Sequence, residues 1–434
     1  MRADPLTARR PLLADHDQLG HLGIGARGDE PGEQIGGAVK GHDQQDTRQS
    51  VFFDCFSAFD ERQGTIFRAE SRMMNRATTA SPSPLRIALI GAGGISRAHT
   101  KAFPLFPNRI RLVAVADTAL SAARSLAAEN GADVSAFADH RELIAEARPE
   151  AAVITLPHYL HYPVAKDFLE AGIPVLVEKP VTHTASELRD LNALASAKHL
   201  VLMAGQMRRF GSAARHVKQW IDASPENFGE LRSFDAVVQV NVDAYTGGKT
   251  GHWILDGLKA GGGVIASFGI HRVDLVRMLG GADFSEVTAI GRFDAPFLNG
   301  AESQASVLFR MSNGATGTLH ANGRAPRTAY MDSFTLHGTH GSIMEVAGPL
   351  RYATTTGAVT QQWGHQHEGW MDAPDSSDPR DDAFVQQLLE FAASVQSGRP
   401  PSCNTPEMNF NTIACMDAIA ESLRTGRTVN VAKL

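Results

Sequence analysis

The stretch Leu85-Arg86-Ile87-Ala88-Leu89-Ile90-Gly91-Ala92-Gly93-Gly94-Ile95-Ser96 decides the fold of this chain. Its first six residues form an apolar run typical of a strand that is covered on both faces. A glycine-rich turn follows, and the next residues, 96–106, have the pattern of a helix. A dinucleotide pyrophosphate requires this order, because the first glycine permits the tight turn and the second lets backbone amides approach the phosphates. We therefore predict that Gly91, Gly93, Gly94, Ile95 and Ser96 contact a cofactor, although Ser96 stands where the fingerprint prefers Gly or Ala.

The second strand bears on the choice of cofactor. Residues 110–116 are again apolar and are followed by Asp117. An acidic residue at the end of a second strand accepts hydrogen bonds from the adenosine ribose hydroxyls and repels a 2′-phosphate. No arginine follows directly that could hold such a phosphate, so we expect NAD rather than NADP. The plainer alternative, that Asp117 is an ordinary N-cap of a helix over 119–129, is compatible with this role.

Strands and helices continue to alternate along the next hundred residues. Strand patterns cover 151–156, 174–177 and 200–204, and helix patterns cover 162–171 and 185–197. This alternation predicts an α/β fold with a doubly wound parallel sheet, which binds its ligands beyond the carboxyl ends of the strands. The residues expected to line the cofactor there are Thr155, Leu156, Pro157, His158, Glu178, Lys179 and Gln206.

At this point the chain resembles the Gfo/Idh/MocA family of NAD(P)-dependent oxidoreductases, which includes inositol and sugar dehydrogenases. The resemblance runs from about residue 85 to 431 and rests on several motifs in the family's order. They are Gly91-Ala92-Gly93-Gly94-Ile95, Glu178-Lys179-Pro180, Arg208-Arg209-Phe210, Gly261-Gly262-Gly263, His271-Arg272-Val273-Asp274-Leu275, and the closing Asp417-Ala418-Ile419 with Glu421-Ser422 and Thr425-Gly426.

The resemblance implies a Rossmann domain followed by an α/β domain with an open, mostly antiparallel sheet. The sequence supports this independently, because strands after Arg208 alternate between apolar and polar residues, as over 236–242. Similar strands are expected near 306–309, 315–319 and 333–336. We expect residues 1–84 to form a poorly patterned extension and linker, residues 85–207 the NAD(P)-binding domain, and residues 208–434 the substrate-binding and oligomerisation domain. By analogy with the family, the second sheet is expected to join homodimers or homotetramers.

The resemblance also implies the catalytic pair, Lys179 and His271. His271 lies on a helix expected over 264–279, and its neutral imidazole would accept the substrate hydroxyl proton while hydride leaves carbon for nicotinamide. Lys179 would stabilise the developing alkoxide. In the family the bond between this lysine and the following proline is often cis, so a cis Lys179-Pro180 bond is expected.

Substrate contacts are expected from Lys179, Arg208, Trp253, Ser267 and His271. Trp253 offers a ring face to a sugar, although a core position is equally compatible with its sequence context. Ser267 is a departure, because many family members carry an acidic residue four positions before the histidine. A serine can hydrogen-bond a substrate hydroxyl but holds no negative charge, which makes inositol itself a less expected substrate.

The remaining histidine clusters are not expected to bind metal. His158 and His161 resemble the Pro-x-x-x-His segment that lines the nicotinamide side in relatives, so we place both at the cofactor. His365 and His367 lie in a stretch rich in Gly, Gln and Trp, with no Cys or further His nearby to complete a zinc site. No metal site is therefore predicted.

Composition excludes several classes of protein. Lys and Arg number 41 against 47 Asp and Glu, a formal charge of −6, so nucleic-acid binding is not expected. The chain has no apolar run of about 18 residues, so no membrane span is expected. Three separated cysteines form no disulfide framework, which fits a cytoplasmic protein. The apolar patch Val51-Phe52-Phe53 is either a docking segment or, as we favour, part of a leader that is absent if translation starts at Met73 or Met74.

Three functions remain open from the sequence. The first is an NAD-dependent dehydrogenase acting on a secondary alcohol of a sugar, cyclic polyol or related small molecule. The second is an NAD-dependent glycosidase that works by transient oxidation and elimination. The third is a non-catalytic NAD-binding sensor, which the presence of both Lys179 and His271 disfavours.

Overall fold

The computed structural model describes residues 83–326, 331–346, 348–354 and 369–434. Within these ranges the strands form two sheets, one of six strands and one of nine. The chain before residue 83, including Val51 to Phe53, Met73 and Met74, lies outside the described residues, as do His365 and His367.

The first sheet is parallel throughout and has the strand order β3-β2-β1-β4-β5-β6. This order is that of the Rossmann fold. Strands β2 and β3 are added on one side of β1, and strands β4 to β6 are then added on its other side. Apart from the short edge strand β3, the strands of this sheet are mostly buried runs of apolar residues, as the sequence predicts for a sheet with helices on both faces. The strands are β1 (Leu85–Ile90), β2 (Ile110–Ala116), β3 (Ser135–Phe137), β4 (Ala151–Ile154), β5 (Val175–Glu178) and β6 (Leu202–Gly205).

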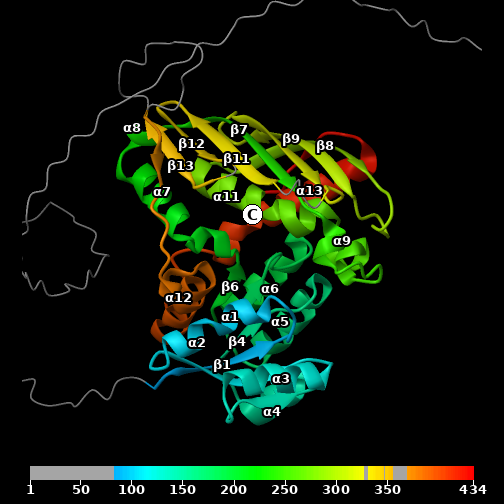
Figure 1. Cartoon of the computed structure of the whole chain (residues 1–434), viewed down its shortest axis with the longest axis vertical. Helices are drawn as coiled ribbons and strands as arrows, with labels where there is room; N and C mark the ends of the chain where they lie inside the picture. The colour runs from blue at the N-terminus through cyan, green and yellow to red at the C-terminus, as the bar shows by residue number, and fades with distance from the viewer. Residues whose placement is uncertain (1–82, 327–330, 347, 355–368) are drawn as a thin grey trace, which may run out of the picture. The chain divides into compact units, whose positions relative to one another are not determined.

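Helices connect these strands and cover the sheet (Figure 1). They are α1 (Ser96–Thr100), α2 (Ala102–Leu105), α3 (Leu120–Asn130), α4 (His140–Ala147), α5 (His161–Glu170) and α6 (Ala185–Ala197). The single helix expected over 96–106 is thus two short helices. Pro104 has no N–H to donate to the carbonyl of Thr100, which explains why the first helix ends there.

The second sheet is mixed and mostly antiparallel, in the order β14-β13-β12-β11-β7-β10-β9-β8-β15. The β7–β10 pair is its parallel exception. The alternation predicted for this region is confirmed, since residues on β9 and β10 are buried and exposed in turn. The strands are β7 (Leu231–Gln239), β8 (Phe284–Arg292), β9 (Gln304–Met311), β10 (Thr316–Asn322), β11 (Met331–Gly338), β12 (Gly341–Glu345), β13 (Arg351–Thr354), β14 (Met371–Asp372) and β15 (Val429–Asn430).

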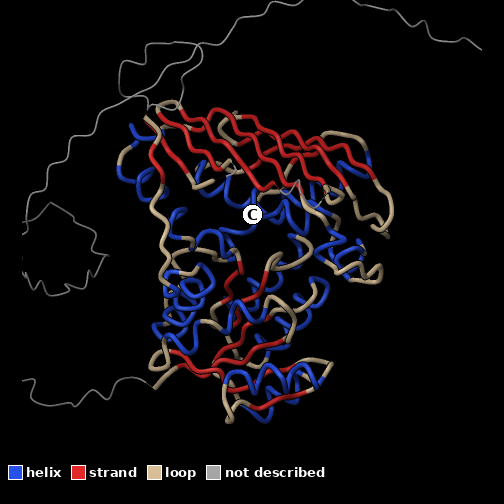
Figure 2. Tube along the Cα trace, viewed as in Figure 1, coloured by secondary structure: helices blue, strands red, loops and turns tan. Residues whose placement is uncertain are grey.

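Helices α11 and α13 cover one face of this sheet, and its other face carries no helix in Figure 2. Helix α12 packs instead against α1 and α2 of the first sheet's layer. The helices of this part are α7 (Ser212–Ala223), α8 (Pro225–Phe228), α9 (Val242–Tyr245), α10 (Gly257–Ala260), α11 (Ile270–Gly280), α12 (Ala383–Ser397) and α13 (Pro406–Thr425). None of the helices in the described ranges is long and apolar enough to cross a membrane.

Candidate functional site

The glycine-rich turn after β1 has room for a cofactor. Gly91 has a φ of +101°, and a Cβ there would lie 2.6 Å from the carbonyl oxygen of Thr155 on the neighbouring strand's end, so only glycine fits. Gly93 and Gly94 are exposed, and a Cβ on either would meet no protein atom within 4 Å. Ser96 is fully buried and donates its hydroxyl to the carbonyl of Gly93, which explains how serine is accommodated there. The turn therefore leaves its backbone open on the side where a pyrophosphate binds.

Asp117 supports the same turn. Its carboxylate accepts hydrogen bonds from the backbone N–H of Ala92 and of Ala119, both at 2.8 Å. The alternative that Asp117 is the N-cap of this helix does not hold, because α3 begins at Leu120 and its N-cap is Ala119. A carboxylate has lone pairs left after two such bonds, so Asp117 can still accept from ribose hydroxyls.

The residues after β4 make buried hydrogen bonds to the backbone of neighbouring segments. Thr155 donates its hydroxyl to the carbonyls of Ile90 and Gly91. Both ring nitrogens of the fully buried His161 face backbone carbonyls, those of Pro180 at 2.7 Å and Leu156 at 2.8 Å. The Nδ1 atom of His158 lies 2.9 Å from the carbonyl of Ala260. These contacts join the ends of β1, β4 and β5, and the role of both histidines at a cofactor stays a prediction.

The segment after β5 holds Lys179, and its bond to Pro180 is cis, as expected. The preceding Glu178 is buried and lies 2.8 Å from Nε2 of His99, a buried residue on α1 that the sequence analysis missed. Burial pushes the pKa of Glu178 up, but the hydrogen bond and charge of His99 and the charge of Lys179 outweigh it and lower that pKa. Burial, together with the charge of Arg208, lowers the pKa of Lys179 to about 8.

The helix that carries His271 starts irregularly. Residues Ile265–Gly269 form a π-helical turn, and α11 begins at Ile270, so the single α-helix expected over 264–279 is interrupted. Such turns occur often at functional sites. Here the backbone carbonyl of Ser267 accepts a hydrogen bond of 2.7 Å from Nζ of Lys179. The buried hydroxyl of Ser267 and Nδ1 of His271, four residues later on the same face, have no partner in the described structure.

A buried carboxylate fixes the start of this helix. Glu302 accepts backbone N–H bonds of 2.8 Å from Gly263 and from Ile265. A Cβ on Gly263 would lie 2.0 Å from the carbonyl oxygen of Glu302, so this member of the triple glycine is required by close packing. Burial raises the pKa of Glu302, and the hydrogen bonds from these N–H groups only partly counteract that rise.

Positive charge gathers around His271. Its pKa lies well below the usual value, first because the imidazole is buried and then because of the charges of Lys179, Arg208, Arg272 and His158. Arg208 is paired with Asp332 of β11, a residue that no sequence pattern singled out. Trp253 is half-buried and packs its edge against His158, with ring centroids 4.6 Å apart. The structure thus brings the predicted catalytic and substrate residues to the carboxyl ends of the first sheet's strands.

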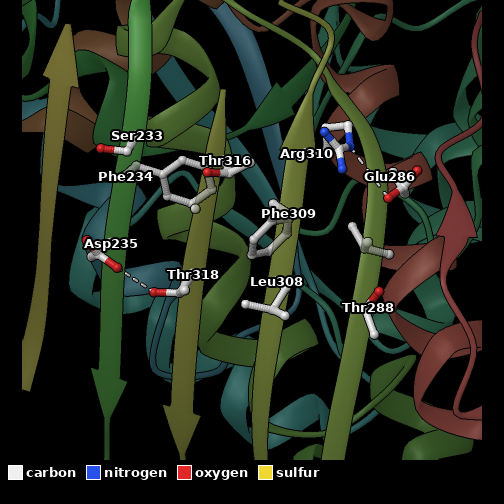
Figure 3. Close-up of a pocket in the computed structure, with 12 residues that line it drawn as sticks. Ser233, Phe234, Asp235, Glu286, Thr288, Leu308, Phe309, Arg310, Thr316 and Thr318 are labelled. Atoms are coloured by element: carbon white, nitrogen blue, oxygen red, sulfur yellow. Dashed lines mark hydrogen bonds and ion pairs between the residues drawn. The ribbon is translucent and has the colours of Figure 1, made fainter. Parts of the chain in front are cut away.

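The hollow drawn in Figure 3 lies elsewhere. It is on the outer face of the second sheet and is lined by residues of β7, β8, β9 and β10, none of which was predicted to be catalytic or to bind cofactor. Among the described residues, no group of three or more His, Cys, Asp and Glu is arranged to hold a metal ion.

The fold and this site together define an NAD-binding oxidoreductase. Residues 85–206 match the Gfo/Idh/MocA oxidoreductase family's NAD-binding Rossmann fold, and residues 214–344 match the family's C-terminal domain. The chain belongs to the Gfo/Idh/MocA family of oxidoreductases.

Its relatives include named dehydrogenases. The chain is 26% identical over 361 residues to the scyllo-inositol 2-dehydrogenase (NAD(+)) of Bacillus subtilis, which covers 80% of this chain and 96% of that protein. It is 30% identical over 237 residues to the trans-1,2-dihydrobenzene-1,2-diol dehydrogenase of Sus scrofa, covering 54% of this chain and 67% of that one. A solved structure of levoglucosan dehydrogenase with NADH and levoglucosan shares the fold, with a TM-score of 0.71, 22% identity, and coverage of 81% of this chain and all of that one.

Proposed function

We propose that this protein is an NAD-dependent dehydrogenase that oxidises a secondary alcohol of a sugar, cyclic polyol or related small molecule. The observation that carries the proposal is the Lys179 ammonium bonded to the carbonyl of Ser267, one helical turn before His271. Relatives named for inositol and levoglucosan oxidation support this class of substrate.

The two polar residues divide the chemistry. His271, whose pKa is lowered by burial and by neighbouring positive charges, is neutral at physiological pH and accepts the hydroxyl proton of the substrate. Lys179 keeps its proton below about pH 8 and stabilises the negative charge that develops on the substrate oxygen. NAD, when bound at the glycine turn, supplies the hydride acceptor.

Three further side chains are proposed to hold the substrate. The unpartnered hydroxyl of Ser267 can bond a substrate hydroxyl beside the reacting carbon. Arg208 offers the guanidinium N–H groups that Asp332 leaves free. Trp253 borders the site through His158 and can pack against a sugar ring.

The test is an absorbance assay for NADH with a panel of sugars and polyols. We expect His271→Ala and Lys179→Ala each to lower turnover at least about tenfold, with NAD affinity little changed, because both act mainly on the substrate. Lys218→Ala, which breaks an exposed ion pair with Asp222, is the matched control. Turnover near the wild-type value in both site variants would overturn the assignment.

Release of nitrophenol from nitrophenyl glycosides without net NADH would instead support the glycosidase, and NAD binding without any turnover would support the sensor.

We also propose that the protein is a cytoplasmic homo-oligomer that associates through the outer face of the second sheet. This face carries polar residues such as Thr316 and Thr318 beside Leu308 and Ile290, which are 60% and 71% exposed. A contiguous exposed apolar patch marks an interaction site, and we propose that Leu308 and Ile290 belong to one. Leu308→Arg is expected to shift the mass seen by sedimentation toward that of one chain, and an unchanged mass would contradict this interface.

A further inference from the structure

Asp332 of β11 binds two arginines that come from different parts of the chain. Its side chain accepts a hydrogen bond from Nη2 of Arg208, in the turn after β6, and another from Nε of Arg272 on α11. The backbone carbonyl of Asp332 accepts a third bond, of 2.9 Å, from Nη2 of Arg272. One residue therefore links the second sheet to the turn that follows the first sheet and to the helix of His271.

Arg272 is held unusually firmly. Its side chain is 1% exposed, its Nη1 donates to Glu345 at 2.7 Å, and its guanidinium lies 4.9 Å from the centre of the Phe334 ring. A buried guanidinium requires such partners, because an unpaired buried charge is costly. Since Arg272 directly follows His271, fixing its side chain also limits how the backbone at His271 can move.

Arg208 is held at one edge only. Its side chain is 28% exposed, and the bond to Asp332 uses one of its five N–H groups. Its remaining donors have no hydrogen-bond partner among the residues that the structure describes and can meet a substrate, but a long side chain without this anchor would sample many rotamers. The anchor therefore decides whether Arg208 is preorganised for binding.

We propose that Asp332 is a positioning residue of the dehydrogenase site, which holds Arg208 in place to bind the substrate and Arg272 in place to orient His271. This inference rests on the proposed function for its kinetic consequence. The basic groups that lower the pKa of His271 are Lys179 after β5, Arg208 after β6, Arg272 on its own helix and, least, His158 after β4. Asp332 is the carboxylate that binds two of these four groups.

The variant Asp332→Asn keeps the shape of the side chain and removes its charge. We expect KM for the alcohol to rise about tenfold or more, with a smaller fall in kcat and no change in NAD affinity, because ground-state contacts through Arg208 are lost. The double variant Asp332→Asn with Arg208→Gln should raise KM no more than Arg208→Gln alone, since both changes remove the same interaction between these two side chains. Asp283→Asn, which removes the charge of an exposed carboxylate paired with Arg277 of the same helix α11, should leave KM unchanged.

Two results would overturn the proposal. One is a variant that only loses thermal stability, with KM unchanged; the other is a double variant in which the two effects multiply. Crystal structures of the wild-type enzyme and of Asp332→Asn with NAD bound give a readout that needs no substrate. Arg208 should leave its place in the variant, and an unmoved Arg208 would refute its anchoring by Asp332. If the wild-type enzyme oxidises no alcohol, the proposed function fails, while this comparison still decides the role of Asp332.

Discussion

Lys179 and His271 are both basic residues in surroundings that disfavour their charged forms. Burial is the first cause in each case, and it lowers the pKa of Lys179 to about 8 and that of His271 well below its usual value. Between these two pKa values the lysine is protonated and the imidazole is neutral. An acid and a base with separated pKa values are what proton transfer with charge stabilisation requires.

The activity should therefore have a basic limit set by Lys179. Because its pKa is lowered, the ammonium loses its proton near pH 8 rather than above pH 10, and kcat/KM for alcohol oxidation should fall as the pH rises through about 8. Initial rates with saturating NAD over pH 6 to about 10 measure this. A rate that stays constant through pH 10 would contradict the charged role of Lys179.

Ser267→Asp should move this limit. A carboxylate within about 4–6 Å of a cation favours its charged form, so the pKa of Lys179 should rise by about one unit or more and the fall in kcat/KM should begin at higher pH. Ser267→Asn has nearly the same shape without the charge and serves as the control. An equal pH profile in the two variants would show that position 267 does not act on Lys179 electrostatically.

Among single residues, the sequence identifies those whose position in the site is fixed by the strand that they directly follow. Lys179 and Thr155 directly follow strands, and the carboxyl edge of a parallel sheet brings such residues together. His99 and Asp332 could not be found in this way. Their roles depend on Glu178 and on the two arginines, which are distant in the chain and meet only after packing.

At the scale of helices and strands, the sequence predicts the bounds of an element well where a single regular pattern of apolar residues runs along its whole length. Helix α6 begins and ends where the sequence predicts, and it carries a capping box of Thr184 and Glu187. The π-helical turn before α11 could not be predicted, because its apolar residues also fit a plain α-helix. Contacts at its start are not local either, since Glu302 binds the N–H groups of Gly263 and Ile265 from another part of the chain.

The turn between β1 and α1 allows cofactor binding to be tested apart from catalysis. Gly93→Ala adds a methyl group that meets no protein atom within 4 Å, so the thermal stability should hardly change. If the phosphates approach the turn at Gly93, as we propose, the same methyl group should obstruct them, and NAD affinity should fall about tenfold or more. Fluorescence titration with NAD and thermal unfolding measure the two effects.

Gly205→Ala is the opposite case and serves as the contrast. Its Cβ would lie 2.8 Å from Cα of Glu178 between β5 and β6, so this variant should lose stability through backbone displacement. If Gly93→Ala retains wild-type NAD affinity, the pyrophosphate does not lie against the turn at that position.

At the scale of the whole molecule, a buried ion pair joins the segment after β6, at the end of the first sheet, to helix α11, which covers the second sheet. Arg209, just after β6, donates from Nε and Nη2 to Asp274 of α11, the Nε bond being 2.7 Å long. Thr412 of α13 donates to the same carboxylate at 3.1 Å. The side chains of Arg209 and Asp274 are 4% and 2% exposed. The sequence shows both residues within motifs but gives no sign that they meet.

Asp274→Ala should therefore be severely destabilising. It leaves the guanidinium of Arg209 buried and unpaired, which typically costs about 3–5 kcal/mol. The pair of Arg277 on α11 with the exposed Asp283, which follows the helix, provides the control, because Asp283→Asn should cost less than about 1 kcal/mol. Urea unfolding followed by circular dichroism measures both.

The stability lost in Asp274→Ala can come from the unpaired charge of Arg209 or from altered packing around Thr412. The double substitution Arg209→Met with Asp274→Leu distinguishes these two causes. Replacing both charges by apolar side chains of similar volume removes the desolvation cost along with the attraction, so much of the stability lost in Asp274→Ala should return. If the double variant is instead as unstable as Asp274→Ala, then packing around Thr412, rather than the unpaired charge, accounts for the loss.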